Sequence, residues 1–237
     1  MAEVAEDFSS RKDAETTQGK AGEASPKSQE RRERILDAAE ELFATSGFDG
    51  VTLRQIAKLA GVDVALTSYY FGPKLQLFDA VLKRRGEILN RARLDALRSA
   101  EAESAPNPPS IERVIEAFLR PLEIAQESED RGWRNYCALI AYVNNSPVWG
   151  KKMIGKHFDK LVREFTAAMQ RCFPEAPARD IFWCYHNLSG ALSLTFADTG
   201  RIDILSENAC QSHDFKSAYD RMIPFMAAGF REICGGH

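Results

Sequence analysis

The sequence of 237 residues lacks the patterns that mark metalloproteins and disulfide-stabilised proteins. Its five cysteines are odd in number and widely spaced, with no C-x-x-C pair, which argues against a disulfide framework and a zinc site. The four histidines show no H-E-x-x-H or other paired ligand spacing. We therefore expect no metal, no cofactor and a reducing compartment.

Long apolar runs are also missing. No stretch reaches the ~18 uninterrupted apolar residues of a membrane helix, and the polar start of the chain is unlike a secretory signal. Residues 1–27 contain a single aromatic residue, Phe8, among many Ala, Glu, Ser, Thr and Lys. Such a composition cannot bury enough apolar surface to offset the entropy lost on ordering. We predict a disordered arm over 1–27, a cytoplasmic protein and no membrane partner.

Positive charge is scarce over the chain as a whole. Thirty-one Lys and Arg against 34 Asp and Glu give a net charge of −3, which excludes a protein that coats nucleic acid through bulk charge. Over residues 28–93, however, eleven basic residues outnumber nine acidic ones. Site-specific DNA binding through a few placed side chains stays open.

What the sequence does contain is apolar residues at spacings of three and four, which predict helices. No alternating strand pattern exceeds four residues, so we predict an all-α protein. The proline cluster at 104–110 and the polar stretch at 200–213 indicate loops. The expected helices run from Ser28 to about residue 46 and over about 52–60, 63–71, 73–102, 110–127, 131–145, 147–173, 177–199 and 214–234.

Residues 52–71 have the layout of a helix-turn-helix. Thr52 with Gln55 three residues later indicates a capping box, Gly61 suits a tight turn, and Asp63 is a good N-cap. In such a unit the second helix enters the major groove of DNA. The pattern predicts DNA binding.

The run RERILDAAEELFATSGFDGVTLRQIAKLAGVDVALTSYYFGPKLQLFDAVL resembles the DNA-binding domain of the tetracycline-repressor (TetR) family. The similar elements are I-L-x-A-A-x-x-L-F, G-F-x-G-x-T, I-A-x-x-A-G-V and the exit Y-x-F-G-x-K, in one order without gaps. The resemblance implies an N-terminal three-helix helix-turn-helix domain over 28–75. A long helix would join it to a helical ligand-binding and dimerisation bundle over 76–237.

The resemblance also implies roles for individual residues. The family's base-contacting positions are held here by Arg54, Val64, Ala65 and Tyr69. Its phosphate-contacting positions are held by Thr52, Ser68, Tyr70 and Lys74. Arg54 is the best base reader, because a guanidinium can bond guanine O6 and N7 together. Two positions depart from the family pattern, since Thr67 replaces an aliphatic core residue and Ser68 replaces a tyrosine.

The C-terminal half predicts an effector pocket and a dimer interface. Aromatic residues mixed with amides suit an apolar pocket with a few orienting polar groups. The expected pocket residues are Trp133, Tyr136, Tyr142, Phe165, Met169, Trp183 and Asn187. The expected helices over about 177–199 and 214–234 are apolar around most of their circumference and contain small residues that permit close approach. They favour an isologous four-helix interface between two subunits. Its expected residues are Phe182, His186, Gly190, Leu194, Phe225 and Ala228.

Together these features predict a homodimeric transcriptional regulator rather than an enzyme. We expect a repressor that a small apolar or aromatic effector releases from a palindromic operator in double-stranded DNA. Two alternatives stay open. A helical small-molecule enzyme lacks support, because we find no nucleophile–base spacing, metal cluster or phosphate loop. The other is an interaction protein that keeps the fold without binding DNA.

Overall fold

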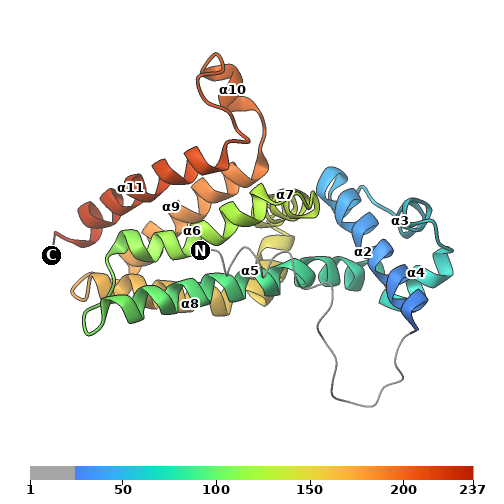
Figure 1. Cartoon of the computed structure of the whole chain (residues 1–237), viewed down its shortest axis with the longest axis horizontal. Coiled ribbons are helices and arrows are strands. Elements are labelled where there is room, and N and C mark those ends of the chain that lie inside the picture. The colour runs from blue at the N-terminus through green and yellow to red at the C-terminus, as the bar shows by residue number, and fades with distance from the viewer. Residues whose placement is uncertain (1–24, 237) are drawn as a thin grey trace. The chain divides into compact units, whose positions relative to one another are not determined.

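The computed structural model describes residues 25–236, and every regular element in this range is helical, which confirms the all-α prediction (Figure 1). Apart from its last three residues, the predicted arm over 1–27 lies outside the described residues. Pro26 and Lys27 already belong to the first helix. None of the described helices is both long and apolar enough to cross a membrane.

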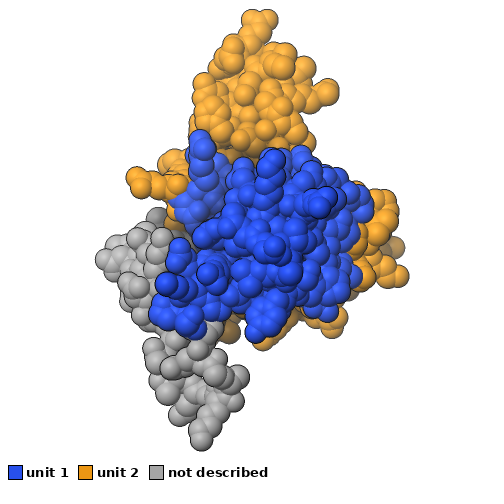
Figure 2. Space-filling model, turned by 90° about the vertical axis from the view of Figure 1, so that its right-hand side faces the viewer, with its two compact units in different colours: residues 1–85, 130–139 blue, residues 86–129, 140–237 orange. Residues whose placement is uncertain are grey.

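The chain divides into two compact units (Figure 2). Of the described residues, unit 1 comprises 25–85 together with 130–139, and unit 2 comprises 86–129 with 140–236. The long helix α5 (Lys74–Ser104) contributes its first part to unit 1 and the remainder to unit 2. This division differs from the expected boundary at 75/76, because a segment far along the chain packs with the N-terminal helices.

Unit 1 is built on α2 (Pro26–Ser46), α3 (Leu53–Ala60) and α4 (Val64–Phe71). Its core contains Phe43 and Phe78, whose rings meet edge to face at 5.0 Å. The turn between α3 and α4 is held by Arg34, whose guanidinium donates to the carbonyls of Ala60 and Gly61. Gly61 has φ +64°, a conformation that a side chain would strain.

Unit 2 contains most of the remaining helices, and α7 is shared between the units. Helix α11 packs against both α6 and α9. The predicted helix ends mostly agree with the observed ones to within one or two residues. The elements are α6 (Ile111–Glu127), α7 (Gly132–Asn144), the π-helical turn η1 (Gly150–Ile154), α8 (Gly155–Cys172), α9 (Ala178–Ala197), α10 (Arg201–Leu205) and α11 (Phe215–Cys234).

Two segments differ from the predictions. The helix expected over 147–173 begins only at Gly150, and its first turn is π-helical. The stretch 200–213, expected as a loop, contains the short helix α10, none of whose residues is buried. The spacing of apolar residues predicts a helix only when one face of the helix packs on a core. Helix α10 has no such face, so this spacing does not predict it.

Candidate functional site

The entry to the helix-turn-helix has the expected capping box. The amide of Gln55 donates to Thr52 Oγ1 over 3.3 Å, and the Thr52 amide donates to Gln55 Oε1 over 2.8 Å. The Thr52 hydroxyl also lies 2.8 Å from the same Oε1, to which it donates its proton. The hydroxyl therefore fixes the start of α3, and a phosphate bond from it would compete with Gln55.

Helix α4 presents the expected base-contacting side chains to solvent. Its N-cap Asp63 accepts a 2.7 Å hydrogen bond from the Ala65 amide. Val64 and Ala65 are exposed, and Tyr69 is 81% exposed. On α3, Arg54 is also exposed and forms no ion pair or hydrogen bond with other residues of the 25–236 range. These four side chains are thus accessible to a DNA groove.

The expected phosphate-contacting residues are engaged to different degrees. Ser68 is exposed, whereas the hydroxyl of Tyr70 forms a 2.8 Å hydrogen bond with that of Ser28. The ammonium of Lys74 donates to the carbonyls of Phe48 and Val51, over 2.9 and 2.8 Å. Because an ammonium has three N–H groups, Lys74 can hold the loop before α3 and still donate one bond outward.

Thr67, one of the two departures from the family pattern, is fully buried in unit 1. Its hydroxyl has no hydrogen-bond partner among the described residues. A buried unsatisfied hydroxyl destabilises a fold by about 1–3 kcal/mol. The recognition helix therefore packs less favourably than one with an aliphatic residue here.

Sequence reasoning missed an ion-pair network in unit 1 that is centred on the buried carboxylate of Glu40. The carboxylate of Glu40 accepts from Arg84 Nη2 at 2.9 Å and from Arg85 Nε at 2.8 Å. Arg85 also donates from Nη1 to Asp130 Oδ2 over 2.8 Å, and its guanidinium lies over the ring of Trp133. The signal was present, because Glu40 follows Leu36 by four residues and precedes Phe43 by three, on the apolar face of α2.

Burial alone would lower the pKa of the Arg84 and Arg85 guanidinium groups, but the charge and hydrogen bonds of Glu40 hold it above the ordinary value. For Asp130, partial burial acts to raise the pKa, but the hydrogen bonds from Arg85 and the Gly132 amide, together with the charges of Arg85 and Arg84, outweigh it and lower the pKa. Arg84, Arg85 and Asp130 are therefore charged at neutral pH. The network joins α2, α5 and the start of α7 within unit 1.

In unit 2 an apolar face of α9 and α11 is exposed. It carries all six residues expected at the dimer interface, and Phe225 is 74% exposed. A Cβ added at Gly190 would meet nothing within 4 Å, so the surface is open there. Trp183, 63% exposed, and Asn187 lie on the outside of α9 as well. These two expected pocket residues are therefore placed beside the expected interface rather than in the interior.

The other expected pocket residues are divided between the units. Phe165 and Met169 are buried in unit 2 and Tyr142 is half-buried, whereas Trp133 and Tyr136 are buried parts of unit 1. The structure does not bring all seven into one cavity of unit 2.

An aromatic cluster nevertheless occupies the interior of unit 2, around Phe118 of α6. Its ring lies 5.0 Å from that of Phe165 on α8 and 6.3 Å from that of Tyr185 on α9. Arg93 of α5 adds a buried guanidinium 4.1 Å from the Phe118 ring centre, and its Nε donates to the Phe118 carbonyl. Sequence reasoning missed Arg93, although it lies four residues from Leu89 and Leu97 on the apolar face of α5.

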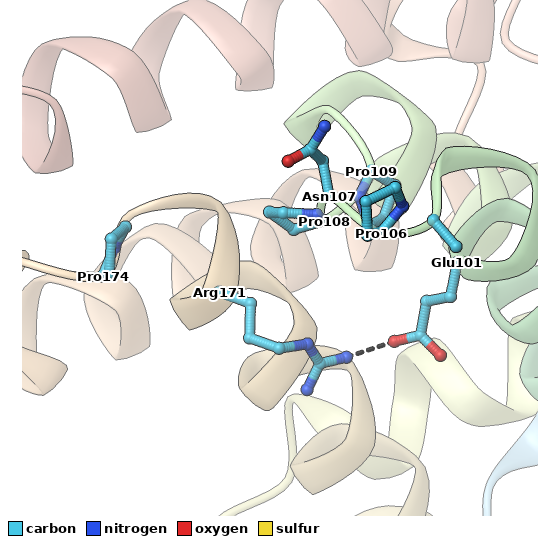
Figure 3. Close-up of a pocket in the computed structure, with 8 residues that line it drawn as sticks. Glu101, Pro106, Asn107, Pro108, Pro109, Arg171 and Pro174 are labelled. Carbon is cyan, nitrogen blue, oxygen red and sulfur yellow. Dashed lines mark hydrogen bonds and ion pairs between the residues drawn. The ribbon is translucent and has the colours of Figure 1, made fainter.

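A separate hollow of about 530 Å³ lies between the α5–α6 loop and the end of α8 (Figure 3). It is lined by Pro106, Pro108, Pro109 and Pro174, and also by Arg171 and Glu101, which form an ion pair. None of the expected effector residues lines this hollow.

The structure thus combines a helix-turn-helix unit with a second helical unit, an arrangement that defines a class of DNA-binding proteins. Comparison with known proteins places this class in a family. Residues 35–81 match the family model described as "Bacterial regulatory proteins, tetR family", and residues 116–229 match "Tetracyclin repressor-like, C-terminal domain". The chain belongs to the tetracycline-repressor family of transcriptional regulators.

Curated relatives match only part of this chain. The HTH-type transcriptional regulator BetI of Rhizobium meliloti (strain 1021) is 33% identical over 98 residues, which are 41% of this chain and 46% of the relative. The HTH-type transcriptional activator FasR of Mycolicibacterium smegmatis is 32% identical over 94 residues, which are 40% of this chain and 41% of the relative. The chain spans less than half the length of these two relatives.

Solved structures extend the similarity of fold over nearly the whole chain. A TetR-like transcriptional regulator from Rhodococcus sp. RHA1 has a TM-score of 0.59 at 18% identity, covering 92% of this chain and 100% of that one. A transcriptional regulator from Aquifex aeolicus VF5 has a TM-score of 0.53 at 14% identity, covering 84% and 98%. At such identities these structures show the shared fold alone.

Proposed function

We propose that the protein is a ligand-responsive transcriptional regulator that binds a palindromic operator as a homodimer in the cytoplasm and acts as a repressor. The observation that carries the proposal is the exposed surface of α3 and α4. There Arg54, Val64 and Tyr69 face solvent on a turn fixed by two N-caps. Neither a helical enzyme nor a DNA-independent scaffold has an observation in its favour.

The dimer is supported by the exposed face of α9 and α11. Large apolar side chains such as Phe182, Leu194 and Phe225 are costly to leave in water, and contiguous apolar patches mark interaction sites. An isologous contact through this face gives two-fold symmetry. Two-fold symmetry matches two recognition helices to the halves of a palindrome.

For the effector we propose the interior of unit 2 around Phe118. Helices α5, α6, α8 and α9 each contribute a side chain to this cluster. Aromatic rings with one guanidinium suit a ligand with an apolar or aromatic body. Phe165 and Met169 remain in the proposed pocket, whereas Trp183 and Asn187 are proposed for the dimer face instead.

The test is selection of DNA from a random duplex pool by the full-length chain, followed by affinity measurement on the enriched sequence. We expect an inverted repeat, bound by one dimer, with affinity that falls as salt rises. Enrichment of no sequence above background would contradict DNA recognition. Candidate effectors are then screened for release of the bound operator.

A further inference from the structure

The segment that links α9 to α11, residues 198–214, stands out from the end of the helix pair (Figure 1). We call it the arm. Its helix α10 has no buried residue, and its aliphatic side chains are exposed: Ile204 by 82%, Leu205 by 70% and Ile202 by 48%. Three neighbouring aliphatic side chains on one protruding element form a surface that favours being covered.

The arm holds its shape through its own hydrogen bonds. The Ser212 amide donates to Asp203 Oδ1 over 2.5 Å, and the Asn208 amide donates to the Asp203 carbonyl over 2.8 Å. Ser206 Oγ accepts from the Cys210 amide over 2.9 Å. The aliphatic side chains are thus presented on a preorganised element, which lowers the entropy cost of docking.

The arm is acidic, and another part of unit 2 is its electrostatic complement. Within the arm a single basic residue, Arg201, stands against four carboxylates, a net charge of −3. Residues 148–160 carry four lysines and one aspartate, a net charge of +3. Val148 is largely exposed there, and so are Lys151 and Lys152. Both segments therefore combine exposed apolar side chains with charges of opposite sign.

The chain's own basic segment does not cover the arm, because the aliphatic side chains of α10 stay exposed in the single chain. We propose that in the dimer each arm docks on residues 148–160 of the second copy. Ile204 and Leu205 then cover Val148, and the arm's carboxylates face Lys151 and Lys152. The inference rests on the proposed function, since it requires a dimer, and symmetry makes the contact occur twice.

The first test uses Cys210, the exposed cysteine within the arm, as an attachment point for a photo-cross-linker. After irradiation of the full-length protein, we expect a covalent dimer whose cross-linked peptide lies within residues 148–160. The variant Cys210→Ser is the control and should give no such product. Cross-links confined to one chain, in a sample that sedimentation shows to be dimeric, would overturn the arm contact and leave the dimer standing. A monomer would overturn both.

The second test is a charge exchange measured by the dimer dissociation constant. We expect Glu207→Lys alone and Lys152→Glu alone to weaken the dimer about 3- to 10-fold, as suits an exposed ion pair that occurs twice. The double variant should return to within about twofold of the natural chain. Glu175→Lys, an exposed change of equal charge outside the arm, is the matched control. Additive weakening in the double variant would contradict the contact.

Discussion

Arg85 donates a 2.8 Å hydrogen bond from Nε to Oε2 of Glu40, a carboxylate that is only 1% exposed. The same guanidinium bonds Asp130, so one side chain of α5 ties a buried charge on α2 to the residues that precede α7. Gly132 leaves room for it, because a Cβ there would lie 1.7 Å from Arg85 Nη2. The guanidinium of Arg85 therefore links the parts of unit 1, and it depends on the carboxylates of Glu40 and Asp130 to do so.

Removal of the charge of Glu40 should therefore destabilise the protein. In Glu40→Gln, two partly buried guanidinium groups lose the buried carboxylate that they share, and we expect the free energy of unfolding to fall by about 3 kcal/mol. Urea denaturation followed by circular dichroism measures this change. Asp37→Asn removes an exposed partner of Arg84 and should change stability by less than about 0.5 kcal/mol. Equal effects of the two variants would contradict a special role for Glu40.

The same network predicts a dependence of stability on pH. The pKa of Asp130 is lowered in the folded protein, so its stabilising contribution is present above the ordinary aspartate pKa and is lost as the pH falls through the lower, folded value. We expect Asp130→Asn to flatten the loss of thermal stability in that acidic range and to leave its slope at neutral pH unchanged. A parallel acid profile for both proteins would refute the assignment.

Thr67 offers a change in the opposite direction. Thr67→Val replaces the unsatisfied buried hydroxyl by a methyl group of similar size, and we expect a gain of about 1 kcal/mol in the free energy of unfolding. Thr67→Ala, which removes the buried methyl group too, should instead destabilise. Since Thr67 is buried, operator affinity should stay within about twofold in Thr67→Val. A loss of stability in this variant would show that the hydroxyl has a partner after all.

Arg54 should determine base preference. If its exposed guanidinium reads a guanine, Arg54→Ala weakens operator binding by about 1–3 kcal/mol and relaxes the preference at one position of each half-site. Fluorescence anisotropy on operator variants measures both effects. Arg98→Ala removes an exposed positive charge from unit 2 and serves as the control. Uniform weakening across all operator variants would assign Arg54 to phosphate instead.

The five cysteines should differ sharply in reactivity. Burial raises the pKa of the Cys172 thiol to about 11 and that of Cys184 to about 12, whereas Cys210 is exposed. Thiolates rather than thiols react, so a thiol reagent near pH 8 should modify Cys210 first. We expect one fast thiol in the native protein and five after denaturation. A fast phase that persists in Cys210→Ser would contradict this order.

Most helix ends could be predicted because their signals are local. The Thr52–Gln55 box and the Asp63 cap depend on neighbours within three residues, and both are present in the structure. The ion pairs of Glu40 with Arg84 and Arg85 join residues more than 40 positions apart. The local spacing of apolar residues cannot predict which of these distant residues will pair. Helix α10 was not predicted because none of its residues is buried, so it has no apolar face that a spacing could reveal.

The faces of α9 were harder to assign for a different reason. Phe182 and Trp183 sit beside the buried Cys184, and apolar residues occur around most of the helix. When a helix is apolar on all sides, spacing alone cannot separate side chains that fill an interior from those that meet a partner. The same ambiguity placed Trp183 and Asn187 among the expected pocket residues.

Unit 1 is assembled from two described stretches of chain, residues 25–85 and 130–139. A fragment that ends at Arg85 would keep the helix-turn-helix but lose Asp130 and Trp133, leaving the Arg85 guanidinium without two of its contacts. A chimaera that combines this DNA specificity with another effector unit therefore needs two junctions in the chain, one on each side of the transplanted 130–139 segment, in addition to the cut in α5. In evolutionary terms, the two halves are not freely exchangeable modules.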